Sequence, residues 1–154
     1  MNQELTQKLL DKYPKLFSKV KRIYCGDGWF HLIDLTCQLL QGYADRNSQD
    51  PTSQVAFTNV HVHMGELRLF YVGGRMHDYL DGVRDNAQKM SARMCEETGK
   101  PGAKHRANDG TIRTVSAQYA AENGLTPLMP VIAVVDTKSS PVELGPVGAV
   151  LTSR

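Results

Sequence analysis

The sequence predicts an α+β domain in which a small antiparallel sheet packs against two or three helices. Two runs with strand character, 54–64 and 66–72, follow one another across Gly65. Apolar residues recur at helical spacing on both sides of them, over 29–41 and 75–95. The chain has 154 residues, 41% of them apolar and 22% charged, so it is long enough to bury such a core without disulfides or metal.

The N-terminal part is expected to hold two helices. A short helix over 2–12 ends before Pro14, because proline cannot continue it. After the turn 25–29, Trp29 begins the apolar stripe of the next helix, which we expect Asp27 to cap and Gly42 to end. A polar loop is then predicted over 43–54.

The central part is expected to form a hairpin and a long helix. A turn at Gly65-Glu66 joins the two strands, whose apolar residues do not alternate cleanly. The helix 75–95 follows and carries Gly82 at its middle, which indicates close packing against another element at that point.

The C-terminal part changes in character after residue 124. A loop is expected over 99–113 and a short helix over 115–123, which closes a single domain spanning 1–124. Residues 125–154 form an extension punctuated by four prolines. Within it Val131–Val135 is predicted as a strand, at a sheet edge or supplied to a partner.

Four positions have the spacing of a zinc knuckle but not its ligands. Cys95 and Thr98 are separated by two residues, and so are Ser116 and Tyr119. A zinc ribbon needs cysteine or histidine at all four positions, and only Cys95 retains one. We therefore interpret the segment as a degenerate zinc-ribbon-like knuckle, and expect no metal and no cofactor there.

Several motifs together resemble a family of small proteins encoded by tailed bacteriophages and prophages. The most specific are the GDGW block, Cys25–Trp29, and the C-E-x-x-G-x-P-G block, Cys95–Gly102. The resemblance also rests on Tyr13-Pro14-x-Leu16-Phe17, on Gly65-x-Leu67-Arg68 and on Arg113-Thr114. It implies a phage origin, an α+β core and a zinc-ribbon-like knuckle, whose ligands this chain has mostly lost; it implies no activity.

Two groups of residues are candidates for chemistry or binding. His61 and His63 are two apart on a predicted strand, so both imidazoles can face one metal, with a third ligand from His77, Asp78 or His31. The basic residues of the loop offer a surface to nucleic acid or to another partner, with the Tyr119 ring available for stacking; they are Lys100, Lys104, Arg106 and Arg113.

Composition restricts the partners and the cellular compartment that we expect for this protein. The net charge of +2 is too small to indicate nucleic acid by itself, although residues 1–24 hold six basic side chains and two acidic ones. Three widely spaced cysteines, and no apolar run of signal-peptide or membrane-spanning type, favour the cytoplasm of the host cell and no membrane partner.

Together these observations favour a phage accessory protein that is not an enzyme. We expect it to bind a host or phage macromolecule, in the first place a protein, for example as an inhibitor of a host enzyme or defence system. Two alternatives stay open: a nucleic-acid-binding module that uses the loop 100–113, and a metal-dependent enzyme that uses His61 and His63.

Overall fold

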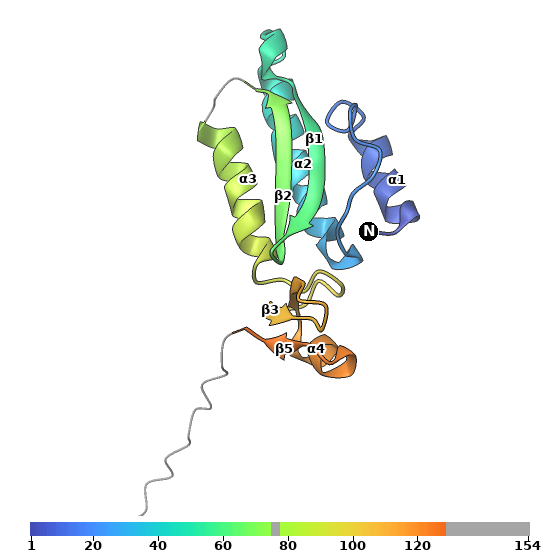
Figure 1. The fold of residues 1–154 in the computed structure, drawn as a ribbon. Helices are drawn as coiled ribbons and strands as arrows, with labels where there is room; N and C mark the ends of the chain where they lie inside the picture. The colour runs from blue at the N-terminus through green and yellow to red at the C-terminus, as the bar shows by residue number, and fades with distance from the viewer. Residues whose placement is uncertain (75–77, 129–154) are drawn as a thin grey trace, which may run out of the picture.

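The computed structural model describes residues 1–74 and 78–128, and it confirms the α+β class (Figure 1). The described chain forms a larger body, residues 1–74 and 78–93, and a smaller C-terminal unit, residues 94–128. In the body a hairpin of β1 (Val55–His63) and β2 (Glu66–Gly73) lies over α2 (Phe30–Arg46), with α3 (Asp78–Ser91) beside β2. The C-terminal unit lies at the end of the body where the hairpin turns, so the hairpin tip and the unit meet.

Helix α1 (Gln3–Lys12) is where the sequence predicts it. Asn2 caps it by accepting a hydrogen bond from the Leu5 N–H at 2.9 Å, and the helix ends before Pro14 as expected. Asp27, by contrast, does not cap the second helix. Both of its carboxylate oxygens accept hydrogen bonds from Asn2, at 2.6 and 2.8 Å, which ties the start of the chain to the GDGW turn.

Helix α2 (Phe30–Arg46) follows a short 3-10 turn, η1 (Asp27–Trp29). The prediction that Gly42 ends this helix is wrong. A glycine inside a helix lowers the stability of the helix by about 1 kcal/mol relative to alanine. Leu40 and Ala44, on either side of Gly42, are both buried in the body, and their packing keeps this turn helical. A second 3-10 turn, η2 (Pro51–Ser53), then leads into the hairpin.

The hairpin pairs β1 (Val55–His63) with β2 (Glu66–Gly73). Its two-residue turn is Met64-Gly65, one residue earlier than expected, and both residues have positive φ, 53° and 73°. The register shifts between Phe57 and Asn59, which explains why the apolar residues do not alternate cleanly. On its other edge β1 pairs with Tyr24, which exchanges hydrogen bonds of 3.0 Å with the backbone of Val60 and Val62.

Helix α3 (Asp78–Ser91) is shorter than the predicted helix 75–95, whose first three residues lie outside the described part of the chain. Its buried side chains, Leu80, Val83 and Ala87, face the body core. Gly82 does not mark a close contact, since a Cβ placed there would have no atom within 4 Å. The helix ends at Ser91, whose hydroxyl accepts a hydrogen bond from the Leu67 N–H at 2.8 Å.

The C-terminal unit is a three-stranded antiparallel sheet with one short helix. Its elements are β3 (Ala103–Arg106), β4 (Ile112–Val115), α4 (Ala117–Asn123) and β5 (Thr126–Pro127), with strand order β4-β3-β5. The predicted loop 99–113 therefore contains a strand and the start of another. Residues 125–128 belong to the unit through β5, whereas the predicted strand Val131–Val135 lies outside the described residues.

Candidate functional site

The GDGW turn and the loop after Met94 are bound to each other by their backbones. The Gly28 N–H donates to the Glu96 carbonyl at 2.8 Å, and the Trp29 indole N–H donates to the Met94 carbonyl, also at 2.8 Å. Trp29 is fully buried in the body core, so its ring anchors the turn while its nitrogen reaches the C-terminal unit. The two most specific motifs of the sequence thus form one junction.

This junction requires the glycines of the turn. A Cβ on Gly26 would lie 2.1 Å from the Glu96 carbonyl oxygen. A Cβ on Gly28 would lie 2.3 Å from the Gly99 nitrogen and 2.5 Å from the Cys95 carbonyl oxygen. Backbone atoms cannot move aside as a flexible side chain can, so a methyl group at either position separates the body from the C-terminal unit.

The four degenerate knuckle positions lie close together. Cys95 is fully buried, and its thiol lies near the Thr98 hydroxyl and the Ser116 N–H. The Ser116 hydroxyl caps α4 by accepting from the Tyr119 N–H at 3.3 Å. The Tyr119 ring packs against the small cluster that contains Cys95, Val115 and Ala120. That this arrangement derives from a zinc site stays an interpretation.

The Cys95 thiol is the one cysteine that its surroundings make more acidic. Burial raises its pKa, but the hydrogen bonds from the Thr98 hydroxyl and from the backbone N–H groups of Ser116, Thr98 and Glu97 outweigh burial, so the pKa lies below the ordinary value. In contrast, burial raises the pKa of Cys25 to about 12 and raises that of Cys37 as well. All three cysteines are free.

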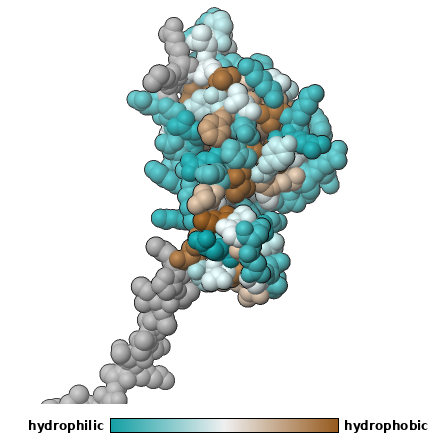
Figure 2. Space-filling view, viewed as in Figure 1, coloured by the Kyte–Doolittle hydropathy of each residue, from teal (hydrophilic) through white to brown (hydrophobic). Residues whose placement is uncertain are grey.

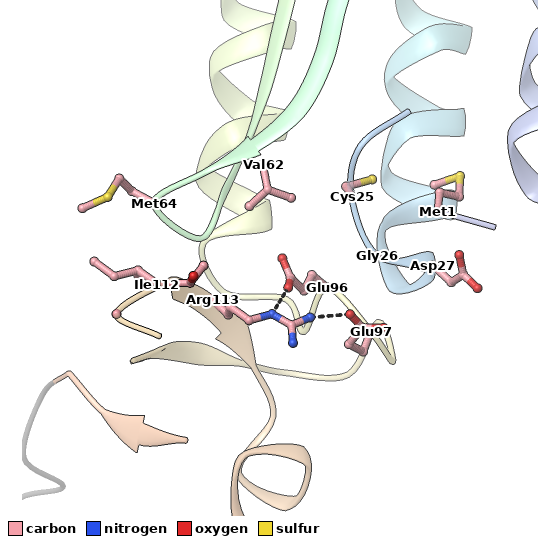
Figure 3. A pocket seen from close by; sticks show the side chains of 12 residues that line it. Met1, Cys25, Gly26, Asp27, Val62, Met64, Glu96, Glu97, Ile112 and Arg113 are labelled. Atoms are coloured by element: carbon pink, nitrogen blue, oxygen red, sulfur yellow. Dashed lines mark hydrogen bonds and ion pairs between the residues drawn. The ribbon is translucent and has the colours of Figure 1, made fainter. Parts of the chain in front are cut away.

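A hollow of about 560 Å³, which we call the junction cavity, lies between the hairpin tip, the GDGW turn and β4 (Figure 3). Glu96 and Arg113 face each other across its floor, and the Arg113 guanidinium binds the carboxylates of both Glu96 and Glu97. The remaining walls combine apolar side chains, Cys25, Val62 and Ile112 among them, with the polar side chains of Asp27 and Thr111.

Glu96 is unusual among these residues because its side chain is only 5% exposed. One carboxylate oxygen is bound to Arg113, while the other, Oε2, is buried with no hydrogen-bond partner in the described chain. Burial raises the pKa of Glu96, and Arg113 opposes that shift only in part. Spacing alone did not single out Glu96, because it stands beside Glu97 in an apparently solvated loop.

The basic residues of the loop 100–113 do not form one free surface. Lys104 binds the Glu66 carboxylate at 2.6 Å, and Arg113 is engaged in the junction cavity, where its guanidinium also lies 5.6 Å from the centre of the Tyr119 ring. Lys100 and Arg106 are exposed, with no ion pair to a described residue. Two of the four predicted contact residues, Lys104 and Arg113, therefore already form ion pairs within the fold.

His61 and His63 share the outer face of the hairpin, the face that points away from α2, as their spacing predicts. The His61 ring stacks on Phe70, with 5.7 Å between ring centres and 6° between planes, and its Nδ1 is buried without a partner. Of the other proposed ligands, His31 packs its ring edge against Phe30, and His77 lies outside the described residues. Within 1–74 and 78–128 no group of three or more His, Cys, Asp or Glu is arranged to hold a metal ion.

The outer face of the hairpin carries a set of residues that we call the hairpin platform: Tyr24, His61, Arg68 and Phe70. Tyr24, His61 and Arg68 lie in one row across three paired segments, and Phe70 stacks diagonally on His61. Tyr24 is 60% exposed and Phe70 is 53% exposed. The platform is not evident from the sequence, because the pairing of Tyr24 with β1 joins residues that are far apart in the chain.

A larger apolar hollow, about 950 Å³, lies on another side of the C-terminal unit. It is lined mainly by alanines with Leu125, Pro127 and Leu128, and its polar lining comes from Arg93, Lys104 and His105. It offers packing surface, not a catalytic arrangement.

No family model, no curated protein and no solved structure matches the chain.

Proposed function

We propose that this protein is a non-enzymatic binding protein whose hairpin platform holds a single strand of nucleic acid. The observation that carries the proposal is the platform itself: two exposed aromatic rings and a stacked imidazole on one open sheet face, beside Arg68. Proteins that bind single strands combine stacking rings with positive charge in this way. Figure 2 shows apolar residues set in a broken band among hydrophilic ones on the side where the hairpin lies in front of α2.

The charges around the platform fit a polyanion. The segment that leads into Tyr24 carries four exposed cations that form no ion pair with a described residue: Lys15, Lys19, Lys21 and Arg22. The one carboxylate of the β1–β2 strands is Glu66, which is already bound by Lys104 and Gln88 and, at 3.4 Å, by Arg68 of the platform itself. Positive charge of this kind supports binding that weakens with salt.

The site geometry also favours binding over catalysis. The thiol of Cys25, which lines the junction cavity, has a raised pKa and so is protonated near neutral pH. The His61 ring is engaged with Phe70 and not with a carboxylate that would orient it. These features support the expectation that the protein is not an enzyme.

We place this binding protein, on the strength of its resemblance, among phage accessory factors that act in the host cytoplasm. None of the helices in the described part of the chain is long and apolar enough to cross a membrane. A protein partner, such as a host enzyme or a defence component, stays the alternative ligand of the same exposed face.

Fluorescence anisotropy with labelled 15-nucleotide single strands of DNA and RNA tests the proposal. We expect saturable binding that weakens steeply between about 50 and 200 mM salt. Phe70→Ala and Tyr24→Ala should each weaken binding by roughly tenfold, because stacking contributes about 1–3 kcal/mol per base. Both side chains are exposed, so these variants should keep the wild-type melting temperature.

Two further variants separate the alternatives. Leu35→Ala removes an exposed apolar side chain from α2 and should leave binding unchanged. Lys100→Ala/Arg106→Ala tests the loop 100–113 and should have a smaller effect than the platform variants. An absence of binding to either nucleic acid at low salt refutes the proposal, and equal losses in Leu35→Ala and Phe70→Ala would do the same.

A further inference from the structure

The junction cavity contains a buried carboxylate oxygen that the fold leaves unused. The Glu96 side chain is 5% exposed, and its Oε2 has no hydrogen-bond partner within residues 1–74 and 78–128. Nearly all buried polar groups in native proteins are paired, so an unpaired carboxylate oxygen at the wall of a 560 Å³ hollow needs an explanation. A bound ligand that donates a hydrogen bond to this oxygen would explain it.

The neighbouring groups cannot supply that donor. Arg113 already divides its guanidinium between Glu96 and Glu97. Asp27 faces the cavity as well, but it is an acceptor, and both of its oxygens are bound by Asn2. The Met1 amino group lies close enough to lower the Glu96 pKa slightly, yet it makes no hydrogen bond to Oε2. Three carboxylates against the Arg113 guanidinium and the Met1 amino group leave this site with an excess of one negative charge, which favours a cationic donor.

The apolar walls fit the other part of such a ligand. Cys25, Val62 and Ile112 border the hollow, and Figure 3 shows Val62 and Cys25 on the side facing Glu96, with Ile112 beside Arg113. These walls suit a short hydrocarbon stem, in the way that long basic side chains bury their methylenes while the charged head is bound.

Met64 gives a second and independent indication. Among the described residues it is the one non-glycine with positive φ, in a turn position where asparagine or glycine is preferred. Its side chain lines the junction cavity. Strained backbone positions of this kind cluster at active sites and ligand clamps.

We propose that the junction cavity binds an aliphatic organic cation, an amine or guanidinium on a short hydrocarbon stem. The charged head donates to Glu96 Oε2, and the stem lies against Val62, Ile112 and Met64. The source of the cation is a free small molecule or a lysine or arginine side chain of a partner. The site is separate from the hairpin platform, so the two proposals fail or succeed independently.

Titration of the full chain with n-butylammonium chloride, followed by amide chemical shifts, tests the site. We expect saturable shifts at Glu96, Val62 and Met64. Neutral 1-butanol and matched sodium chloride are the controls and should give no saturable change there. N-acetyl-lysinamide separates the sources: binding by both amines indicates a partner's side chain, and binding by n-butylammonium alone indicates a free amine.

Glu96→Gln removes the negative charge and keeps an acceptor for Arg113, and it should weaken n-butylammonium binding at least tenfold. Glu122→Gln changes an exposed carboxylate on α4, outside the cavity, and should leave binding unchanged. Met64→Gly relieves the positive φ and removes part of the apolar wall, so it should raise the melting temperature and still weaken binding. It therefore tests the site even where Glu96→Gln does not fold.

Three results would overturn the proposal. One is the absence of saturable shifts with n-butylammonium. The second is equal binding by 1-butanol, which would make the cavity a merely apolar hollow. The third is undiminished binding by a folded Glu96→Gln variant.

Discussion

The body and the C-terminal unit are stabilised by different means. The body buries twenty side chains in one cluster, almost all of them apolar and drawn from α1, the segment 13–29, α2, the hairpin and α3. The C-terminal unit buries only Cys95, Val115 and Ala120 in a cluster of its own. So small a cluster supplies little hydrophobic stabilisation.

The C-terminal unit, with so little buried surface of its own, depends on the body for its shape. Hydrogen bonds from the Gly28 N–H and the Trp29 indole join the two, and the Thr114 hydroxyl donates to the Gly65 carbonyl at 2.5 Å. Four predictions test this dependence and the interpretation of the degenerate knuckle, beginning with the variant that should destabilise the protein most.

Gly28→Ala should cost more than about 4 kcal/mol of unfolding free energy, since the new methyl group would collide with the backbone of Cys95 and Gly99. Chemical denaturation measures the change. Gly82→Ala is the matched control, because its Cβ meets no atom and it should stabilise α3 by about 1 kcal/mol. A Gly28→Ala variant as stable as the wild type would show that the junction contributes little.

Trp29→Phe should cost about 3 kcal/mol, because the Met94 carbonyl loses its donor and the smaller ring leaves space in the core. Native-state hydrogen exchange gives the more telling measurement. We expect the amides of Cys95 and Gly99 to lose more protection than those of β1 and β2. Equal losses in both regions would contradict a C-terminal unit that depends on the junction.

The pH dependence of stability should differ between the wild type and Glu96→Gln. Burial holds the Glu96 pKa above its ordinary value of 4.5 despite Arg113, so the folded state binds the proton more tightly than the unfolded state. This contribution is present below pH 4.5 and is lost as pH rises through the folded-state pKa.

Relative to Glu96→Gln, the wild type should therefore lose stability with rising pH, by up to about 1.4 kcal/mol for each unit by which the pKa is raised. Denaturation curves of both proteins, recorded at intervals of about one pH unit between pH 4 and 8, give the slope of unfolding free energy against pH. The groups that face Glu96 are Arg113, Glu97 and the Met1 amino group, and they stay the same in both proteins. A slope of the opposite sign would mean that ionised Glu96 is the stabilised form.

Chelation should have no effect on the wild type. EDTA should leave its melting temperature unchanged, and elemental analysis should find no stoichiometric zinc, because Thr98, Ser116 and Tyr119 are poor zinc ligands. A melting temperature that falls with EDTA would contradict the interpretation.

The triple variant Thr98→Cys/Ser116→Cys/Tyr119→His is the positive control for that test. It places zinc ligands at all four degenerate knuckle positions and should bind about one equivalent of zinc. Failure of this folded variant to bind zinc would show that the spacing of these positions is not that of a knuckle.

Patterns within short segments were enough to predict the α+β class, α1 and the two strands. Helical spacing and alternation depend on which face of an element is buried, and that information lies in neighbouring residues. The predictions were wrong where contacts between residues far apart in the chain determine the local structure. Asp27 binds Asn2 instead of capping α2. The helix continues past Gly42 because residues on both sides of it are buried. Within the segment 99–113, β3 forms because β4 and β5 pair with it.

The α+β class and the degenerate spacing at Cys95, Thr98, Ser116 and Tyr119 follow from the order of residues alone, because periodicity and ligand identity are local properties. Three features follow from the fold instead: the GDGW turn binds the loop after Met94, Glu96 is buried with an unpaired oxygen, and Tyr24 joins the hairpin platform. Burial, desolvation and strand pairing depend on atoms far apart in the chain, which come together when the backbone folds.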